Sequence, residues 1–432
     1  MVVKIGLLGF GTVAKGLPFL LKENQPKIRQ LAGLDIEIGK VLVRSQEKAD
    51  ALRSQGHDYD FVTSMDAILA DETIKIVVEL MGRIEPAKSY ISQALKAGKH
   101  VVSANKDLIA CHGQELIQLA QQHQVMFAYE AAVAGGIPIL RTLSESLMAD
   151  KVTRILGVLN GTSNYMLTKM VEENWTYEKA LASAQALGYA ESDPKNDVEG
   201  IDAAYKLAIL SQFGFGMTIR IDQIHHQGIT VIRPEDVAIA KELGYVIKLI
   251  GDLQETQSGI WAEVVPSLVP IKHPLAGVND VMNAVLVESV GVGQSMYYGP
   301  GAGQNPTATS VLADLMHISR NLLEGQAVKP FNAYQRPCRL AKAEEILSAY
   351  YVSVVVLDAS AQLAQLADLF EAHNACFDQV LEGQSDQETL LITVITKAIT
   401  RQQMAKIQSA IDDSNAFALT NIFKVLGESD EN

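Results

Sequence analysis

The first fourteen residues constrain the fold more than any other part of the chain. Val2–Leu8 is a mostly apolar run, as expected for a parallel strand covered on both faces, and residues 9–14 read Gly-Phe-Gly-Thr-Val-Ala. A helical pattern follows over residues 13–21. Such a turn between strand and helix is typical of dinucleotide binding, in which Gly9 makes the tight turn and Gly11 lets a pyrophosphate approach the helix start. A glycine-rich connection without a ligand is the alternative.

The second predicted strand indicates which nicotinamide cofactor the chain prefers. It covers Ile36–Val43 and ends at Arg44, with Lys48 one helical turn further on. Sites for NAD usually place an acidic residue here for the ribose diol, whereas a guanidinium suits the 2′-phosphate of NADP. We therefore predict NADP as the preferred cofactor, with NAD as the alternative if the two basic residues are only solvated.

Two further apolar strands are predicted to end at the same edge of the sheet. They cover Ile74–Leu80 and His100–Ser103, and Lys106 lies just beyond the second. Open α/β sheets bind their ligands at the carboxyl ends of the strands. Lys106 is therefore predicted to contact the cofactor or to take part in catalysis.

A tight turn after the next predicted strand, Val125–Tyr129, is a candidate cation site. Glu130 opens the turn, which continues through Gly135 and Gly136 to Ile137. Backbone carbonyls turned outward by such a bend, together with the Glu130 carboxylate, are suitable ligands for a hard cation. An ordinary turn between two domains explains the same residues.

An acidic loop followed by a lysine on a helix is the main candidate for substrate binding. Residues 188–206 place five acidic side chains ahead of Lys206, and the apolar rhythm becomes helical near Asp197. On such a helix Asp202 and Lys206 are four residues apart and share one face. A lysine beside a fixed carboxylate suits proton transfer on a small cationic substrate, and an exposed ion pair on an ordinary helix is the alternative.

The rest of this middle region supplies two further turns before helices. A turn at 160–161 is predicted to lead into a helix at 164–173, capped by the hydroxyl residues between them. A glycine-rich loop at 299–303 precedes a predicted helix at 307–323, which we expect to pack back on the first domain.

Length, charge and cysteine content restrict the domain count and the kinds of partner. The chain has 432 residues, 48% of them hydrophobic, which predicts two or three domains. Its charge balance is 36 − 50 = −14, without a basic tract, and no apolar run approaches the ~20 residues of a membrane span. We therefore expect neither a nucleic-acid nor a membrane partner. Three scattered cysteines form no disulfide or zinc pattern, and a cytoplasmic protein is predicted.

The order of the predicted elements indicates an α/β protein with three domains. We expect a Rossmann-type dinucleotide-binding domain at 1–140, a second, α+β domain at 141–320, a linker at 321–349 and a C-terminal module at 350–432. The last has a β-α-β-β-α-β plan, which is typical of a ferredoxin-like fold.

Six segments together resemble homoserine dehydrogenase over nearly the full chain. They are residues 9–14, Ser103–Lys106, Tyr129–Pro138, Leu159–Tyr165, Gly188–Lys206 and Gly299–Gly303. Each segment alone is modest evidence for the family, whereas all six in this order are specific to it. The resemblance implies reversible reduction of L-aspartate 4-semialdehyde to L-homoserine with NAD(P)H, in threonine, methionine and isoleucine biosynthesis. It also implies a homodimer or larger homo-oligomer formed through the second domain, and a C-terminal domain of ACT type.

The resemblance also implies a role for individual residues. Lys206 would be the acid/base residue, and Lys106 would lie between substrate and nicotinamide. Glu191 and Asp202 would bind the substrate, with Asp197 as a further contact or as a residue that only positions the turn. Cofactor contacts are expected from Gly9, Phe10, Gly11, Thr12, Val13, Arg44, Ser103, Lys106, Gly188 and Gly303. The family's site for sodium or potassium would be formed by Glu130, Val133, Gly135 and Ile137, mostly through carbonyls.

Three positions depart from the family pattern. Ala14 stands where most members have glycine, and Arg83 replaces a common glycine of the cofactor loop. Residues 358–363 lack the Pro-Gly usual in amino-acid-binding ACT domains, so threonine inhibition through this module is left open.

Two other functions fit the residues less well. An aspartate-semialdehyde dehydrogenase needs an acylatable cysteine at a strand-helix elbow, and a non-catalytic amino-acid sensor should have lost the lysines and the acidic loop.

Overall fold

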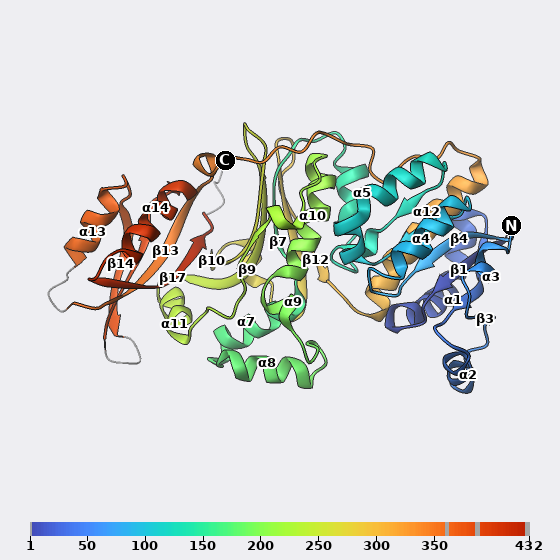
Figure 1. The fold of residues 1–432 in the computed structure, drawn as a ribbon, viewed down its shortest axis with the longest axis horizontal. Helices are drawn as coiled ribbons and strands as arrows, with labels where there is room; N and C mark the ends of the chain where they lie inside the picture. Colours follow the sequence, from blue (N-terminus) through green and yellow to red (C-terminus); the bar gives the residue numbers. More distant parts are fainter. Residues whose placement is uncertain (1, 359–362, 385–388, 428–432) are drawn as a thin grey trace. The chain divides into compact units, whose positions relative to one another are not determined.

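The computed structural model describes residues 2–358, 363–384 and 389–427, and their contacts divide the chain into two compact units (Figure 1). The first unit comprises residues 1–151, 208–221 and 297–336. The second comprises residues 152–207, 222–296 and 337–432. The division into three domains expected from the sequence stays a prediction, because the strands of the expected second and third domains share one sheet.

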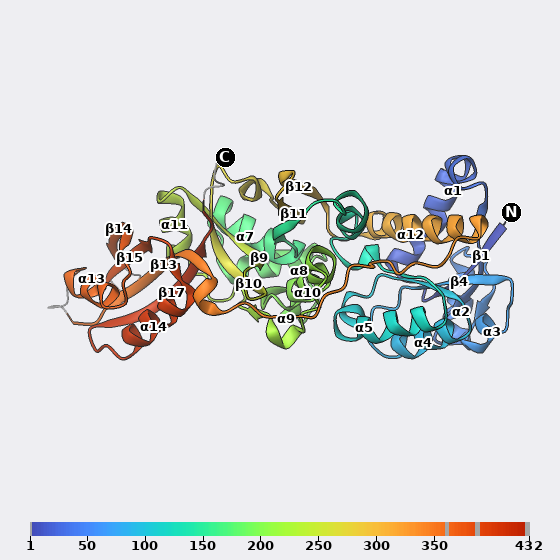
Figure 2. The same cartoon turned by 90° about the horizontal axis from the view of Figure 1, so that it is seen from above.

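A six-stranded parallel sheet with the order β3-β2-β1-β4-β5-β6 forms the centre of the first unit. This is the strand order of a Rossmann-type domain, so the predicted dinucleotide-binding fold is confirmed. The strands are β1 (Val2–Leu8), β2 (Asp35–Leu42), β3 (Phe61–Val62), β4 (Ile74–Glu79), β5 (His100–Ser103) and β6 (Phe127–Ala128). The α-helices of this part are α1 (Thr12–Ala32), α2 (Gln46–Ser54), α3 (Asp66–Leu69), α4 (Ala87–Lys96), α5 (Lys106–Gln122), α6 (Ile139–Arg141) and, later in the chain, α12 (Gln304–Glu324). Figure 2 shows α1 and α12 on one face of the sheet and α4 and α5 on the other.

Helix α1 is longer than the sequence predicted, because it continues through Pro18 and Pro26 to residue 32. Each proline removes one helical hydrogen bond, but burial of the apolar face of the helix outweighs this loss. That face packs on α12, and the two backbones come close together. A Cβ atom added at Gly16 would lie 2.8 Å from the carbonyl oxygen of Gln304.

Helix α12 belongs to the core of the first unit, although it begins 304 − 141 = 163 residues after the end of α6 in the chain. Val311, Leu315 and Ile318 are fully buried in the same apolar cluster as Ile5 of β1. The helix begins three residues earlier than predicted, and Pro306 therefore lies within its first turn.

The second unit contains an eleven-stranded sheet, nine of whose strands have the order β12-β11-β7-β9-β10-β17-β13-β15-β14. The strands of its first half are β7 (Val152–Val158), β8 (His225–His226), β9 (Tyr245–Glu255), β10 (Ile260–Pro270), β11 (Met282–Ser289) and β12 (Gly293–Pro300). The helices that accompany them are α7 (Gly161–Glu173), α8 (Tyr177–Ala186), α9 (Lys195–Val198) and α11 (Pro234–Glu242). Helix α10 (Ile201–Phe215) begins in this unit, and its residues from 208 onward belong to the first unit. Buried residues of β7, β9, β10 and β11 form one apolar cluster on this half of the sheet.

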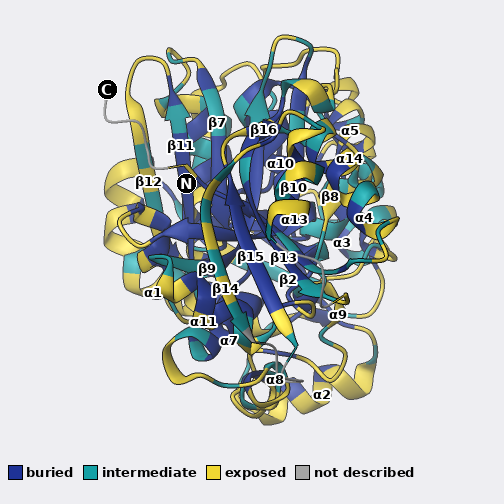
Figure 3. Cartoon of the chain, turned by 90° about the vertical axis from the view of Figure 1, so that its left-hand side faces the viewer, coloured by how far each residue is buried: buried dark blue, intermediate teal, exposed yellow. Residues whose placement is uncertain are grey.

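The C-terminal elements follow the predicted β-α-β-β-α-β order. They are β13 (Leu347–Val356), α13 (Leu363–Glu371), β14 (Phe377–Gln384), β15 (Leu390–Thr396), the short β16 (Ile399–Thr400), α14 (Arg401–Asp412) and β17 (Phe417–Val425). The order β17-β13-β15-β14 with antiparallel neighbours is a ferredoxin-like arrangement. These elements have an apolar core of their own, and β13 and β15 are largely buried (Figure 3). Assignment to the ACT type stays a prediction, and residues 359–362 of the segment that lacks Pro-Gly lie outside the described residues.

Parallel pairing of β10 with β17 joins the two halves of this sheet. Ser267 faces Lys424 and Leu268 faces Val425 in this pairing. The ferredoxin-like elements are therefore bonded to the preceding strands through main-chain hydrogen bonds, while each half retains a separate core.

Candidate active site

The turn between β1 and α1 allows a ligand to approach its backbone closely. Gly9 has a φ of 88°, and a Cβ there would lie 3.2 Å from the carbonyl oxygen of Leu80. Gly11 precedes the first residue of α1, and a Cβ there would have no neighbouring heavy atom within 4 Å. No side chain caps this helix end, so its first N–H groups are suited to a phosphate.

Some side chains of this turn are buried in the core, and others are exposed to solvent. Phe10 is buried and its ring contacts those of His57, Tyr59 and Phe61, so only its backbone suits a cofactor contact. Ala14 is also buried, against the core, where the fingerprint requires a small residue. Thr12 is exposed and Val13 half-buried.

Arg44 is exposed two residues beyond the last residue of β2. Ser45 caps the following helix α2 by accepting a hydrogen bond from the backbone N–H of Lys48, 3.2 Å away. The Arg44 guanidinium is therefore open to solvent between a parallel strand and a capped helix, and its contact with a 2′-phosphate stays a prediction.

A buried carboxylate that the sequence prediction did not assign organises the carboxyl ends of β4 and β5. Glu79 pairs in register with Ser103. The Ser103 hydroxyl donates a hydrogen bond of 2.6 Å to Oε2 of Glu79. The backbone N–H of Met81 donates to Oε1 at 2.7 Å. Burial raises the pKa of Glu79, although these hydrogen bonds oppose the shift. An acidic residue that ends an apolar strand was the signal available in the sequence.

Asn105 extends this network to the loop that carries Arg83. Its side-chain N–H donates to the Arg83 carbonyl at 2.8 Å, and its side-chain oxygen caps α5 by accepting from Leu108 N–H. Arg83 takes part through its backbone, so its departure from the family's glycine does not remove this contact. Lys106 is the first residue of α5 and is about one-third exposed, with its Nζ 3.5 Å from Asp107.

The predicted pair of Asp202 and Lys206 is buried rather than exposed. Lys206 Nζ donates to Asp202 Oδ2 at 2.7 Å and to the carbonyl oxygen of Leu159, and both side chains are only 10% exposed. An ammonium group has three N–H donors, so these two bonds account for two of them among the described residues. The remaining donor can serve a substrate oxygen.

Asn160 links this pair to the acidic loop and was not predicted as a site residue. Its side-chain nitrogen donates to Asp197 at 2.7 Å and to Asp202 at 2.8 Å. Its side-chain oxygen accepts from Ser163 N–H at 2.8 Å and caps α7. The prediction that hydroxyl residues 162 and 163 cap a helix at 164 is therefore wrong, because the Asn160 side chain reaches this N–H first and α7 begins at residue 161.

The other predicted residues of this loop lie at its surface. Glu191 is exposed, and its carbonyl accepts a hydrogen bond from Gln185. Gly188 has a φ of 75°, and a Cβ there would have no heavy atom within 4 Å. The structure thus brings together Asp197, Asp202 and Lys206 and leaves Glu191 open to solvent.

The predicted cation turn has a deeply buried carboxylate at its start. The two oxygens of Glu130 accept hydrogen bonds of 2.8 Å from the N–H groups of Leu140 and Arg141. Asp314 of α12 accepts from the Glu130 N–H at 2.9 Å and also pairs with the Arg141 guanidinium. Burial, followed by the charge of Asp314, raises the pKa of Glu130 to about 8, and burial raises the pKa of Asp314 to about 6.

This turn packs against the glycine-rich loop at 299–303 and against α12. The Gly135 oxygen accepts from the Ser310 hydroxyl at 2.6 Å, and a Cβ at Gly135 would meet the Gly301 carbonyl at 2.4 Å. Val133 and Ile137 are buried in the same turn, and Gly303, with a φ of 127°, precedes α12. The predicted ligand set consists of oxygen atoms alone, which fits a hard cation rather than a transition metal. No cluster of three or more His, Cys, Asp or Glu ligands was found among the described residues.

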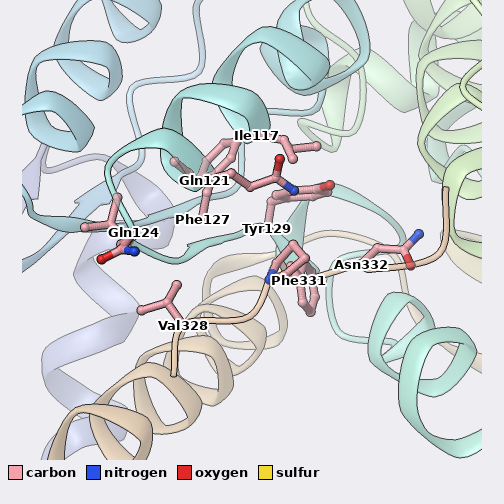
Figure 4. Close-up of a pocket in the computed structure, with 11 residues that line it drawn as sticks. Ile117, Gln121, Gln124, Phe127, Tyr129, Val328, Phe331 and Asn332 are labelled. Atoms are coloured by element: carbon pink, nitrogen blue, oxygen red, sulfur yellow. The ribbon is translucent and has the colours of Figure 1, made fainter. Parts of the chain in front are cut away.

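A pocket of about 330 Å³ beside this turn contains none of the predicted site residues (Figure 4). The rings of Phe127, Tyr129 and Phe331 lie on its walls, and the Phe331 ring also stacks on the Arg141 guanidinium at 5.2 Å. Tyr129 is fully buried and donates to Gln212 of α10. The Tyr129 ring contacts those of Phe127 and Phe331, so the residue before Glu130 is fixed in an aromatic cluster.

Comparison with known proteins identifies the family. Residues 9–130 match the NAD-binding domain of homoserine dehydrogenase, and residues 138–316 match the homoserine dehydrogenase family itself. The homoserine dehydrogenase of Lactococcus lactis subsp. lactis is 54% identical over 428 residues, covering 99% of this chain and 100% of that protein. The chain belongs to the homoserine dehydrogenase family. The member from Bacillus subtilis is 37% identical over 413 residues, with 95% of each chain covered.

Solved structures of homoserine dehydrogenases share the fold over the whole chain. The enzyme from Thiobacillus denitrificans has a TM-score of 0.92 and 35% identity, covering 99% of this chain and 98% of its own. The Staphylococcus aureus homoserine dehydrogenase at pH 6.5 has a TM-score of 0.80 and 32% identity, with 99% and 100% covered. The chain is thus an NAD(P)-dependent oxidoreductase of this family. None of its described helices is long and apolar enough to cross a membrane.

Proposed function

We propose that this chain reversibly reduces L-aspartate 4-semialdehyde to L-homoserine, with Lys206 as the acid/base residue. The observation that carries the proposal is the buried amine of Lys206, held between the Asp202 carboxylate and the Leu159 carbonyl. Two fixed acceptors orient the amine, and its third donor would serve the reacting oxygen. Family membership supports the same reaction.

The reaction needs a hydride for the carbonyl carbon and a proton for its oxygen. The nicotinamide supplies the hydride when it is bound. Lys206 donates a proton to the substrate oxygen during reduction and accepts it again during oxidation. Asp202, with Glu191 and Asp197 as further candidates, binds the ammonium group of the amino-acid substrate, since carboxylates are the natural partners of that group.

We infer NADP as the preferred cofactor, with Gly9, Gly11 and the start of α1 at its pyrophosphate. Arg44 would contact the 2′-phosphate, because it is exposed where this phosphate is bound in sheets of this type. Ser103 is held by Glu79 at the carboxyl end of β5, and Lys106 begins the next helix, which places both at the ligand edge of the sheet. Gly188 and Gly303 stay candidates for the nicotinamide end.

We also propose that the Glu130 turn holds sodium or potassium. Glu130 supplies a buried carboxylate, and Val133, Gly135 and Ile137 supply carbonyl oxygens. A cation here would compensate a carboxylate whose charge is unfavourable in the apolar interior. Titration of the metal-free protein with NaCl, KCl and choline chloride tests this site, and equal activity and melting temperature in all three would contradict it.

A homodimer or larger homo-oligomer is the expected assembly. Strand β12 lies at one edge of the large sheet and exposes Met296 and Tyr298. An apolar edge of this kind favours association with another chain. Light scattering at several concentrations gives the oligomeric state, and a monomer throughout would contradict the expectation. A cytoplasmic location also stays a prediction.

Absorbance at 340 nm tests the proposed reaction. Wild-type protein with L-homoserine and NADP should produce NADPH, and the signal should require the substrate. Absence of the signal across pH 6–10, with and without potassium, would favour a non-catalytic amino-acid sensor. The intact Lys206 cluster is the observation against that alternative.

A further inference from the structure

We infer that Asn160 is a positioning residue for the reaction, which fixes the Asp202 carboxylate and through it the Lys206 amine. The inference rests on the proposed function of Lys206. Asn160 is 5% exposed and lies where β7 ends and α7 begins. Its hydrogen bonds reach Ser163 of α7, Asp197 of α9 and Asp202 of α10, three helices labelled in Figure 1.

The hydrogen bonds of Asn160 leave little freedom for its amide group. Its nitrogen donates to Asp197 Oδ1 at 2.7 Å and to Asp202 Oδ2 at 2.8 Å, which uses both N–H donors. Its oxygen accepts from Ser163 N–H at 2.8 Å. The cap fixes which side of the amide carries the nitrogen, so the orientation of the amide follows from the helix backbone.

Asp202 Oδ2 receives two donors, the Asn160 amide and the Lys206 amine. Lys206 Nζ lies 2.7 Å from the same oxygen. This single oxygen therefore has its position set by Asn160 from one side and holds the amine from the other. Leu159, the neighbour of Asn160, accepts directly from Lys206 through its carbonyl. Residues 159 and 160 thus both hold the Lys206 amine, Leu159 directly through its carbonyl and Asn160 indirectly through Asp202.

The position between Asp197 and Asp202 requires a neutral side chain with two N–H donors, which the Asn160 amide provides. The charged side chains facing Asn160 are Asp197 of α9 and Asp202 with Lys206 of α10. A neutral double donor stabilises both carboxylates in their ionised form and adds no charge near the amine. A carboxylate at this position would repel both acids, and a hydroxyl cannot donate to two acceptors at once.

Asn160→Ser separates positioning from helix capping, because serine can still cap α7 but cannot bridge the two acids. We expect kcat to fall about 10- to 100-fold, since hydrogen bonds to charged groups are lost, with NADPH binding unchanged. The melting temperature should change as little as in Thr176→Ser, which alters the cap of α8 in the same unit. A variant that loses melting temperature but retains wild-type kcat has lost only a structural residue, and this overturns the inference.

Asn160→Asp gives a second readout that does not depend on turnover. A carboxylate at residue 160 cannot donate to Asp202, so the Lys206 amine should lose its fixed position. The ¹³Cε resonance of Lys206, assigned with Lys206→Arg in protein with ¹³C-labelled lysine, should therefore move, and kcat should fall as in Asn160→Ser. An unchanged resonance and kcat would overturn the inference.

The two levels of failure remain distinguishable. If the wild type shows no homoserine-dependent reduction of NADP, the proposed function fails and the inference fails with it. If the wild type is active and both Asn160 variants retain its kcat, only the inference fails.

Discussion

Two buried lysines of the second unit, Lys206 and Lys424, have different surroundings, from which we expect different roles. Lys424 is 4% exposed and donates to both Asp252 and Glu263 at 2.6 Å. Burial alone would lower the pKa of Lys424, but the charges of the two carboxylates outweigh it, so the net shift is upward. Lys206 has one carboxylate and one carbonyl as partners.

The carboxylates around Lys424 are in turn bound by arginines. Arg154 contacts Asp252 through two nitrogens at 2.9 and 2.7 Å, and Arg401 contacts Glu263 at 2.8 Å. These residues come from strands β7, β9, β10 and β17 and from helix α14, so the cluster ties the ferredoxin-like elements to the rest of the sheet. A lysine between two carboxylates that arginines also bind is engaged in charge pairing within the sheet, whereas Lys206, which pairs with one carboxylate, is the candidate for action on a ligand.

The strongest test of this comparison is Lys206→Ala. We expect turnover to fall by about 10²–10⁴-fold, the usual contribution of a positioned acid/base, while NADPH binding stays nearly intact. Steady-state kinetics and quenching of NADPH fluorescence measure the two effects. Retention of most of the turnover would show that the role of Lys206 is misassigned.

Lys424→Met should lower the stability of the fold and leave the activity nearly unchanged, the reverse of Lys206→Ala. Removal of a buried cation leaves two carboxylates with fewer partners, and the free energy of unfolding should fall by about 3 kcal/mol. Activity per folded molecule should be nearly unchanged. Urea unfolding with parallel kinetics tests this, and Lys241→Met, at an exposed position of α11, is the matched control with an expected change within about 0.5 kcal/mol. A loss of kcat without loss of stability would remove the distinction between the two lysines.

An exposed cation extends the comparison to the cofactor. Arg44→Asp should shift the ratio of kcat/KM for NADP and NAD about 10- to 100-fold towards NAD, because a charge-assisted contact with the 2′-phosphate is lost. Lys48→Asp, one turn further in α2, should have a smaller effect. An unchanged ratio in Arg44→Asp would contradict the 2′-phosphate assignment.

A third buried lysine of this unit, Lys248, should make the stability of the fold depend on pH. Lys248 donates to the Val278 carbonyl at 2.6 Å and to Asn279 at 2.8 Å, and burial lowers its pKa to about 8 from 10.5. Between these pH values the unfolded chain retains a proton that the folded chain has released, so stability should rise with pH. The slope is at most about 1.4 kcal/mol per pH unit.

Lys248→Met should flatten this rise, because the variant has no proton to release at this position. Melting temperatures of wild type and variant from pH 7.5 to 10 measure the difference, and other titrating groups contribute equally to both proteins. Parallel curves would contradict the lowered pKa.

Local patterns predicted those parts of the site whose residues are close in sequence. The strand, glycine turn and helix at the start of the chain predicted the nucleotide-binding fold, because their spacing alone dictates a parallel strand with a phosphate-sized turn. The four-residue spacing of Asp202 and Lys206 likewise predicted their hydrogen bond, since a helix brings such residues together. Helix limits were less accurate, as α1 shows, because burial of its face overrides two prolines.

Contacts between distant residues were decided only by the tertiary structure. Asn160 lies 42 residues from Asp202, Glu79 lies 24 residues from Ser103, and Lys424 lies 172 residues from Asp252. No local periodicity encodes such pairs, because their separation depends on which strands become neighbours. The sequence by itself determined which residues could do the chemistry and where the nucleotide-binding turn begins. Only the packing of β7, α9 and α10 decided that the Asp202–Lys206 pair is buried, since burial depends on elements that fold over it from elsewhere in the chain.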